Sequence, residues 1–384
     1  MFLFEVPVSQ AFNDFYRGKT VLVTGSTGFK GSWLAIWLKH LGARVIGYAL
    51  DPPTVPSNFA ASRLDRHITQ ITGDIRDYDL LLKTCREHRP EVFFHLAAQP
   101  LVRRSYEQAR YTFDVNVMGT VNALEAAREA GSVKAAVIIT SDKCYRNVGW
   151  EWAYRETDQL GGYDPYSASK ACAEAVIAVY QDREFQRVSN PSSDINVAST
   201  RAGNVIGGGD WACDRIVPDI IRAITSNRDV VIRNPSATRP WQHVLESLSA
   251  YLWLGALLIG DRRFCSSWNI GPAEMQGLTV EQLASSILSK WRTGSKLVVE
   301  KDHAAPEAQL LRVDCSRANQ YLKWRANWLI DAALDATVVW YTQFYSAGDN
   351  PDMYSVAIQQ IEQYSREAQS RNIAWACNVE STNA

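Results

Sequence analysis

Residues 21–31 read Val21-Leu22-Val23-Thr24-Gly25-Ser26-Thr27-Gly28-Phe29-Lys30-Gly31, and this stretch decides the fold. An apolar strand candidate, residues 20–24, leads through three glycines spaced three apart into a helix candidate over residues 31–41. Such a loop provides a tight turn, a backbone that a pyrophosphate can approach closely, and a helix N-terminus whose N–H groups face the anion. An ordinary glycine-rich turn is the alternative, but the position between strand and helix favours dinucleotide binding. The predicted cofactor contacts in this loop are Gly25, Thr27, Gly28, Phe29 and Gly31.

Outward from this loop, the chain alternates β-branched runs with amphipathic helical stretches. Further strand candidates are residues 44–50, 67–72, 92–96, 135–141 and 195–200, and helix candidates are residues 78–88, 112–130 and the stretch after Tyr166. Continuous apolar strands separated by helices indicate a parallel sheet that is covered on both faces. We therefore predict an α/β fold with a Rossmann-type doubly wound parallel sheet.

Beyond residue 200 the pattern becomes mixed. A glycine-rich loop at 207–209 is followed by short strands and by helix candidates at 217–225, 280–288 and 330–345. We predict a smaller mixed α/β substrate domain here, interleaved with the first. The expected organisation is a dinucleotide-binding domain over residues 17–200, a substrate domain over 201–345 and a C-terminal extension over 346–384.

Composition and charge exclude several classes of protein. With 384 residues, 46% of them hydrophobic, the chain can bury the cores of two or three domains. Forty Lys plus Arg against 41 Asp plus Glu leave a net charge of −1, so no basic field attracts nucleic acid or anionic lipid. The longest apolar stretch, around residues 250–259, falls short of the ~18 to 20 residues that span a bilayer. We expect no nucleic-acid partner and no membrane insertion.

Cysteine, histidine and tryptophan give weaker indications. The seven cysteines lack a CxxC or His-paired spacing, which argues against a disulfide framework and against a metal site. We expect reduced thiols in the cytoplasm, since the N-terminus also lacks the pattern of a secretory signal. His95 lies inside an apolar strand, and we expect it in the core. The 13 Trp residues are expected mainly to pack, although stacking on a base or sugar is the alternative.

The ends of the candidate strands point to one cofactor, because ligands of such sheets bind at the carboxyl edge. Asp51 follows the second strand, where an acidic residue holds the adenosine ribose and an arginine would favour a 2′-phosphate. We therefore predict NAD rather than NADP. Asp74 and Ile75 close the third strand, on the adenine side. The residues that close the fourth strand, on the nicotinamide side, are Leu96, Ala97, Ala98 and Gln99.

A proton-transfer site is predicted around Tyr166. Tyr166 and Lys170 are four residues apart at the start of a helix announced by Asp164 and Pro165, so both side chains lie on one helix face. An ammonium group beside a phenol favours the phenolate and would lower the tyrosine pKa from about 10 toward the working pH. A surface pair is the alternative for YxxxK alone, but Ser141, at the end of the fifth strand, completes a catalytic triad. Tyr166 and Lys170 are also expected to contact the cofactor.

These motifs resemble those of the extended short-chain dehydrogenase/reductases, in which TGSTGFKG, HLAAQ and YSASK follow one another in this order. Within that family the chain is most similar to the nucleotide-sugar 4,6-dehydratases, and among these to the CDP-glucose branch. The similarity is carried by residues 24–34 (TGSTGFKGSWL), 140–147 (TSDKCYRN), 201–207 (RAGNVIG) and 239–244 (RPWQHV), and it covers residues 17–345.

The resemblance implies an NAD-dependent lyase that removes water from CDP-glucose to give a 4-keto-6-deoxy sugar, as in deoxysugar and lipopolysaccharide O-antigen biosynthesis. It also implies a homodimer or a dimer of dimers, paired through the helix over residues 112–130 and the helix after Tyr166. A 4-epimerase, a dehydratase of a UDP-, dTDP- or GDP-linked sugar, and a non-catalytic dinucleotide sensor are the alternatives.

Two residues after the serine distinguish the dehydratases in this comparison. Asp142 would be the acid for the leaving 6-hydroxyl group and Lys143 the base for the C5 proton, where many dehydratases have Asp-Glu. Because an ammonium group cannot accept a proton, either Lys143 is neutral in the closed site, or it stabilises the enolate while another group moves the proton. A solvated turn is the alternative for this pair.

The resemblance also implies a site for the nucleotide in the second domain. Pro240 stands where many relatives have an acidic residue, and stacking of Trp241 on the base is left open. The expected substrate-binding residues are Asn204, Arg215, Arg233, Arg239 and His243.

Overall fold

The main sheet is the centre of the molecule. The structure is a computed structural model and describes residues 8–189, 195–273, 277–292, 294–300, 310–348 and 352–377. The sheet has seven strands in the order β11-β6-β5-β4-β1-β2-β3, all paired in parallel. Their bounds are β1 Thr20–Thr24, β2 Arg44–Ala49, β3 Thr69–Thr72, β4 Val92–His95, β5 Ala135–Ile139, β6 Asn196–Ala202 and β11 Ser267–Ile270. The predicted Rossmann-type sheet is confirmed.

The order of the strands reverses between β1 and β4, which places a crevice at their carboxyl ends. Thr24 pairs with Tyr48 of β2 on one side and with His95 of β4 on the other. The loops that follow these strands therefore begin at the same edge of the sheet. This edge is where a dinucleotide binds in folds of this kind.

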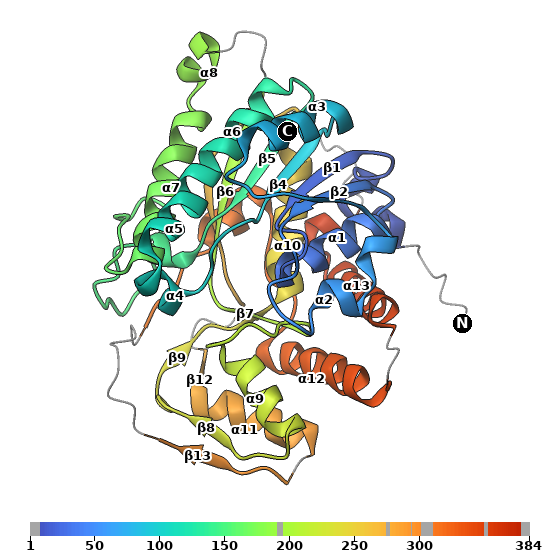
Figure 1. The fold of residues 1–384 in the computed structure, drawn as a ribbon, viewed down its shortest axis with the longest axis vertical. Helices are drawn as coiled ribbons and strands as arrows, with labels where there is room; N and C mark the ends of the chain where they lie inside the picture. The colour runs from blue at the N-terminus through green and yellow to red at the C-terminus, as the bar shows by residue number, and fades with distance from the viewer. Residues whose placement is uncertain are drawn as a thin grey trace.

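Helices cover both faces of the sheet (Figure 1). In β1, Val21 and Val23 belong to one hydrophobic core and Leu22 to the other, as the alternation of side chains along a strand requires. One face carries α1 Phe29–His40, α10 Val244–Leu258 and α13 Met353–Ser370, and the other carries α3 Tyr78–His88, α6 Gly119–Glu129 and α7 Pro165–Gln181. Shorter elements are α2 Asn58–Ala61, α4 Val102–Glu107, α5 Ala109–Phe113, α8 Arg183–Ser189, and the turns η2 Leu64–Arg66, η3 Asp114–Met118, η4 Asp142–Cys144, η5 Arg262–Phe264 and η6 Ala318–Leu322.

A smaller lobe lies beyond the carboxyl edge of the sheet, at the bottom of Figure 1. It contains α9 Ile216–Thr225, α11 Val280–Trp291 and α12 Ile330–Ser346, with the parallel pair β8 Val230–Ile232 and β13 Leu297–Val299 and the antiparallel pair β9 Thr238–Arg239 and β12 Leu278–Thr279. A short parallel pair, β7 Val205–Ile206 and β10 Gln242–His243, connects it to the main sheet. Because α10 and β11 return to the main sheet between these segments, the two parts of the chain are interleaved.

The N-terminal turn η1, Val8–Asp14, packs against the C-terminal part of the chain. The ring of Phe12 stacks on Trp375 of the turn η7, Ala374–Ala376, with ring centroids 5.1 Å apart, and also contacts Trp37 of α1. Residues 352–377 of the expected C-terminal extension thus form part of the core around α1.

Two parts of the fold differ from the sequence-based expectation. β11 is an additional strand, and its Ser267 and Asn269 give it no continuous apolar run. The helix expected over residues 112–130 consists of α5, the π-helical turn η3 and α6.

Ten of the 13 Trp residues are buried, Trp241 among them, so packing is confirmed as their main role. Among the described residues, none of the helices is long and apolar enough to cross a membrane.

Candidate active site

The glycine-rich loop has the shape that its sequence predicts. Gly25 has a φ of +73°, and a Cβ atom there would lie 2.8 Å from the backbone nitrogen of Ala97. A Cβ atom on Gly31 would overlap the carbonyl oxygen of Gly25. Gly28 caps α1, and among the described residues no side chain caps this helix. The N–H groups of its first turn are therefore available to a pyrophosphate, and the loop fits a dinucleotide.

The other predicted cofactor residues follow β2, β3 and β4 at the same edge of the sheet. Thr27 donates a hydrogen bond to the carbonyl oxygen of Leu50 at 2.9 Å, which joins the glycine-rich loop to the end of β2, and Asp51 beyond it is exposed. The carboxylate of Asp74 is held by Arg76 at 2.7 Å, and this hydrogen bond lowers the pKa of Asp74. Ile75 is buried next to Asp74.

The loop after β4 is held in place by hydrogen bonds of the side-chain amide groups of Gln99 and Asn116. Gln99 is buried, and its side-chain nitrogen donates to the carbonyl oxygen of Leu101 and to the hydroxyl group of Thr112 at 3.1 and 2.9 Å. Its backbone exchanges two hydrogen bonds with the side chain of Asn116. Leu96, Ala97 and Ala98 lie partly exposed between β4 and this fixed point.

His95 is a core residue, as predicted. Its Nδ1 atom lies 2.8 Å from the hydroxyl group of Thr24, and its side chain is buried in the sheet. Burial, together with the charge of Lys170, lowers the pKa of His95 to about 3. The ring is therefore neutral and holds two strands together.

Ser141, Asp142 and Lys143 form a tight turn at the end of β5. The Ser141 hydroxyl group accepts a hydrogen bond from the Lys143 N–H at 3.2 Å and donates one to Asp142 at 2.9 Å. Asp142 is buried, whereas Lys143 is half-buried. Burial raises the pKa of Asp142, although Lys143 and Ser141 act in the opposite direction. A buried carboxyl group with a raised pKa is suited to donate a proton.

Tyr166 and Lys170 lie one turn apart on the buried face of α7, whose first turn is capped by Asp164. Lys170 donates a long hydrogen bond, 3.4 Å, to the carbonyl oxygen of Ile139 in β5. Burial lowers the pKa of Lys170 to about 8. The ammonium group therefore faces the strand that carries Ser141.

The predicted effect of Lys170 on Tyr166 is wrong in this arrangement. Burial raises the pKa of Tyr166 to about 12, and a hydrogen bond with Ser141 and the charge of Arg215 oppose this effect. The effect of desolvation on the pKa of Tyr166 is thus larger than the opposing effects of its neighbours. The cation that acts on this hydroxyl group comes from the smaller lobe.

Lys30 is a site residue that the sequence analysis did not single out. It lies in the first turn of α1 and approaches the hydroxyl group of Tyr251 in α10 at 3.4 Å. Burial lowers the pKa of Lys30 to about 8, with a further lowering by Arg215 and an opposing effect of Asp142. Lys30 in turn lowers the pKa of Lys170. The signal in the sequence that could have identified Lys30 is its charge, because it stands between the uncharged residues Phe29 and Gly31 of the cofactor loop.

The smaller lobe contributes one half-buried cation, Arg215, to this cluster. Arg215 forms a 2.8 Å ion pair with Asp210. Asp210, like Lys30, is a residue that the sequence analysis did not single out. Burial opposes the charge of Arg215, but Asp210 more than offsets this effect and raises the arginine pKa. Asn204 is half-buried near the end of β6. A Cβ atom on Gly203 would lie 3.3 Å from the carboxylate of Asp142, so this chain segment borders the catalytic turn.

The remaining predicted substrate residues lie apart from this cluster. Arg233 is exposed beyond β8, and Arg239, half-buried in β9, donates to the carbonyl oxygen of Thr238. His243 has an exposed fraction of 0% and caps α10 by accepting a hydrogen bond from the N–H of Leu245. His243 therefore belongs to the core in this arrangement, where a substrate does not reach it, because its ring packs against Trp33. Trp241 is likewise buried and offers no face to a base.

Metal and disulfide chemistry find no support in the described residues. No group of three or more His, Cys, Asp or Glu side chains in this part of the chain is placed to hold a metal ion. No disulfide joins any of the seven cysteines, all of which lie within the described ranges.

The doubly wound sheet, the glycine-rich loop and the Ser141, Tyr166 and Lys170 side chains define an extended short-chain dehydrogenase/reductase. Comparison with known proteins agrees with this class. The profile of the family described as GDP-mannose 4,6 dehydratase matches residues 22–337, and the chain belongs to this family.

Individual relatives narrow the comparison. A CDP-glucose 4,6-dehydratase of Salmonella typhimurium is 47% identical over 337 residues, which are 88% of this chain and 94% of that protein. A dTDP-glucose 4,6-dehydratase of Xanthomonas campestris pv. campestris is 24% identical over 342 residues, 84% of this chain and 93% of that protein. The solved structure of DesIV, a dTDP-glucose 4,6-dehydratase from Streptomyces venezuelae with NAD bound, has the same fold. Its TM-score is 0.72 at 23% identity, with 86% of this chain and 99% of that chain covered.

Proposed function

We propose that the protein removes water from CDP-glucose to give CDP-4-keto-6-deoxyglucose, with NAD as a cofactor that is regenerated in each cycle. The observation that carries this proposal is the buried Asp142, whose pKa is raised by burial, in the same charged cluster as Tyr166 and Lys170. The relative from Salmonella typhimurium supports the choice of CDP-glucose among nucleotide sugars.

Bound NAD would supply the acceptor for a hydride from sugar C4 and the donor that returns it to C6. The glycine-rich loop, Thr27 and Asp51 would hold it, with Tyr166 and Lys170 on its nicotinamide side. The oxygen of Tyr166 takes the proton of the sugar 4-hydroxyl group. Burial opposes the phenolate, and the positive charge of Arg215 acts against this effect.

The second half of the reaction belongs to the turn after β5. The C4 ketone acidifies the C5 proton, and we assign its removal to Lys143. Asp142 donates its proton to the C6 hydroxyl group, which leaves as water. Its burial keeps this carboxyl group protonated at a higher pH than an exposed aspartate. A 4-epimerase needs neither of these two groups, and the Asp142-Lys143 pair therefore favours the dehydratase.

The diphosphate of the substrate needs cations and polar donors. We assign this role to Arg215, Arg233, Arg239 and Asn204, and leave out His243 because it is buried in the core. The product would enter a deoxysugar pathway such as that of O-antigens. The cytoplasmic location expected from the cysteines stays a prediction.

The proposal is tested with CDP-glucose, UDP-glucose and dTDP-glucose that carry deuterium at C4. CDP-glucose should give a 4-keto-6-deoxy sugar with deuterium at C6 and no net NADH. Tyr166→Phe should bind NAD but turn over at least about 10² to 10³ more slowly. A product that keeps its 6-hydroxyl group would favour the epimerase, and the absence of turnover with all three sugars would favour a sensor.

The role of Lys143 needs a separate experiment. If Lys143 is the C5 base, Lys143→Met should still reduce the cofactor in a single turnover, but no solvent deuterium should enter C5. If Lys143 stabilises the enolate, exchange at C5 should slow but persist. Exchange at the wild-type rate would contradict both roles.

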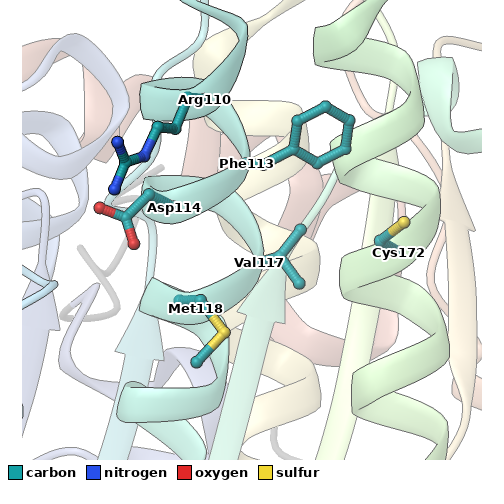
Figure 2. A pocket seen from close by; sticks show the side chains of 6 residues that line it. All are labelled: Arg110, Phe113, Asp114, Val117, Met118 and Cys172. Carbon is teal, nitrogen blue, oxygen red and sulfur yellow. The ribbon is translucent and has the colours of Figure 1, made fainter.

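Two copies of the chain would pair through the outer face of α5, η3 and α7. A groove of about 370 Å³ lies there. Figure 2 shows the side chains that line it, which are Arg110, Phe113, Asp114, Val117, Met118 and Cys172. Met118 is 49% exposed although it is apolar, which favours burial against a second copy. Wild-type protein should sediment as a dimer or a tetramer, and Met118→Glu should sediment as a smaller species. Unchanged sedimentation of this variant would contradict the assigned surface.

A further inference from the structure

A buried ion pair lies beneath the catalytic turn and has no part in the proton transfers described above. Arg201 of β6 and Glu174 of α7 approach to 2.8 Å, and their side chains are 4% and 1% exposed. Burial acts to raise the pKa of Glu174, but Arg201 and the hydrogen bonds to the carboxylate more than offset this effect and lower it. The pair is therefore ionised in the core.

The pair holds both ends of the turn that carries Ser141, Asp142 and Lys143. Thr140, directly before the turn, donates its hydroxyl hydrogen to Glu174. Tyr145, two residues beyond Lys143, accepts a 2.9 Å hydrogen bond from Arg201, whose guanidinium group also lies 5.0 Å from the centre of the tyrosine ring. One ion pair thus holds a residue on each side of the turn.

The same pair is continuous with the helix that carries the other catalytic residues. Glu174 follows Lys170 by four residues, as Lys170 follows Tyr166, so the three side chains lie along one face of α7. The distance between the turn and the pair Tyr166 and Lys170 therefore depends on contacts of Glu174. Proton transfer is sensitive to such distances, since a shift of about 1 Å can cost on the order of 10²-fold in rate.

Stability alone does not account for this arrangement. Desolvation of two buried charges often cancels their attraction, and apolar replacements of such pairs are frequently neutral or stabilising. The carboxylate accepts further hydrogen bonds from Ser199 at 2.9 Å and from Ser267 at 3.1 Å, which fix its orientation. A buried carboxylate held in this way by three hydroxyl groups and one guanidinium group restricts the backbone around it.

We propose that Glu174 and Arg201 are positioning residues that hold the Ser141–Lys143 turn at a fixed place relative to Tyr166 and Lys170. The inference rests on the proposed function, because it is the dehydratase reaction that uses both groups of residues. Neither Glu174 nor Arg201 touches the substrate in this account.

The test uses variants that remove the hydrogen bonds between the turn and the ion pair but keep both members of the ion pair. Thr140→Val and Tyr145→Phe each remove one hydroxyl group that joins the turn to the ion pair, with little change in volume. We expect each to lower kcat about tenfold or more, with the KM for CDP-glucose within about threefold of wild type. Ser267→Ala is the matched control, because it removes a hydrogen bond to Glu174 that leads to β11, and its kcat should stay within about twofold.

A double variant, Glu174→Met with Arg201→Met, covers the case in which a single variant fails to fold. It should fold, since neither member of the ion pair is left buried without the other, but its kcat should fall at least as far as that of Tyr145→Phe. Wild-type kcat in the double variant, or in both link variants, would overturn the inference. An equal loss in Ser267→Ala would also overturn it. Failure of wild-type protein to form the 4-keto-6-deoxy sugar would instead overturn the proposed function.

Discussion

Glu174, beneath the catalytic turn, and Glu246, where α10 meets the C-terminal helix α13, are both buried carboxyl groups with different partners. Glu174 has the guanidinium group of Arg201 at 2.8 Å. Glu246 accepts hydrogen bonds from the backbone N–H groups of Trp328 and Asn327, at 2.6 and 2.9 Å, and from the hydroxyl group of Tyr364 at 2.8 Å. The pKa of Glu174 is lowered, whereas burial raises the pKa of Glu246 to about 7.

The comparison teaches that hydrogen bonds from neutral donors do not compensate for burial of a carboxylate as a cation does. The catalytic region contains positive and negative side chains close to one another. The protonation of each group therefore depends on the charges of the others. In the C-terminal region the hydrogen-bond donors to Glu246 are neutral and the charge of Arg371 offsets only part of the effect of burial, so this carboxyl group can take up a proton instead. The two regions should therefore respond differently to mutation and to pH.

The largest expected effect comes from removing the cation of the first region. Arg201→Met leaves Glu174 buried without its partner and should lower the free energy of unfolding by about 3 to 5 kcal/mol near pH 7. Urea unfolding followed by circular dichroism measures this change, with the Glu174→Met and Arg201→Met double variant as the control that restores stability. A loss below about 1 kcal/mol would show that Glu174 does not depend on this cation.

The second region should show its effect through pH. Because the pKa of Glu246 rises from an ordinary value of 4.5 to about 7 on folding, the folded protein binds more protons between these values. The stability that this group contributes is complete below pH 4.5 and is lost as the pH rises through 7. The loss is on the order of 3 kcal/mol, at 1.36 kcal/mol per pKa unit.

Glu246→Gln should flatten this part of the stability profile, because the amide does not titrate. The measurement is urea unfolding of wild-type protein and variant at several pH values between 4.5 and 7. The two profiles should diverge in slope across this interval. Parallel profiles would contradict the raised pKa of Glu246.

The smallest effect concerns the coupling of charges within the catalytic region. Lys170 faces Glu174 on its own helix, Lys30 from α1, Cys144 from the turn and His95 from β4. Lys30 lowers the pKa values of both Lys170 and Asp142, so Lys30→Met should raise both. Since turnover needs Lys170 charged and Asp142 protonated, the alkaline limb of the kcat profile should move up by about half a pH unit.

Lys39→Met provides the control for this measurement. Lys39 lies on the same helix but is exposed, and its replacement should leave the pH profile unchanged. A downward shift of the alkaline limb in Lys30→Met would contradict the coupling. Loss of NAD affinity in this variant would place Lys30 in the cofactor site instead.

The parts of the molecule that sequence predicts well are those in which neighbouring residues carry the pattern. The loop at 25–31 and the pair Tyr166 and Lys170 are local, and the structure has their predicted elements. Lys30, by contrast, acquires its environment from Tyr251, which is 221 residues away. His243 matches a motif, but whether its ring faces the substrate or the core depends on the packing of α10 against Trp33. Such contacts between distant residues have no periodicity that reveals them.

The same limit applies to charge. An acidic residue one turn beyond Lys170 was visible in the sequence, but its partner Arg201 lies on another element. The raised pKa of Tyr166 follows from the depth of burial, which a spacing of four residues does not report. Sequence therefore predicts which groups take part in the site more reliably than their protonation states.

The stacking of Phe12 on Trp375 determines when the fold can be completed during synthesis. A ribosome releases the N-terminal residues first, and domains generally begin to fold from that end. Phe12 then has to remain without its stacking partner, Trp375, until residue 375 has left the exit tunnel. The core around α1 is thus completed late in folding, and a nascent chain that stalls before residue 375 has emerged exposes an apolar patch that chaperones can recognise.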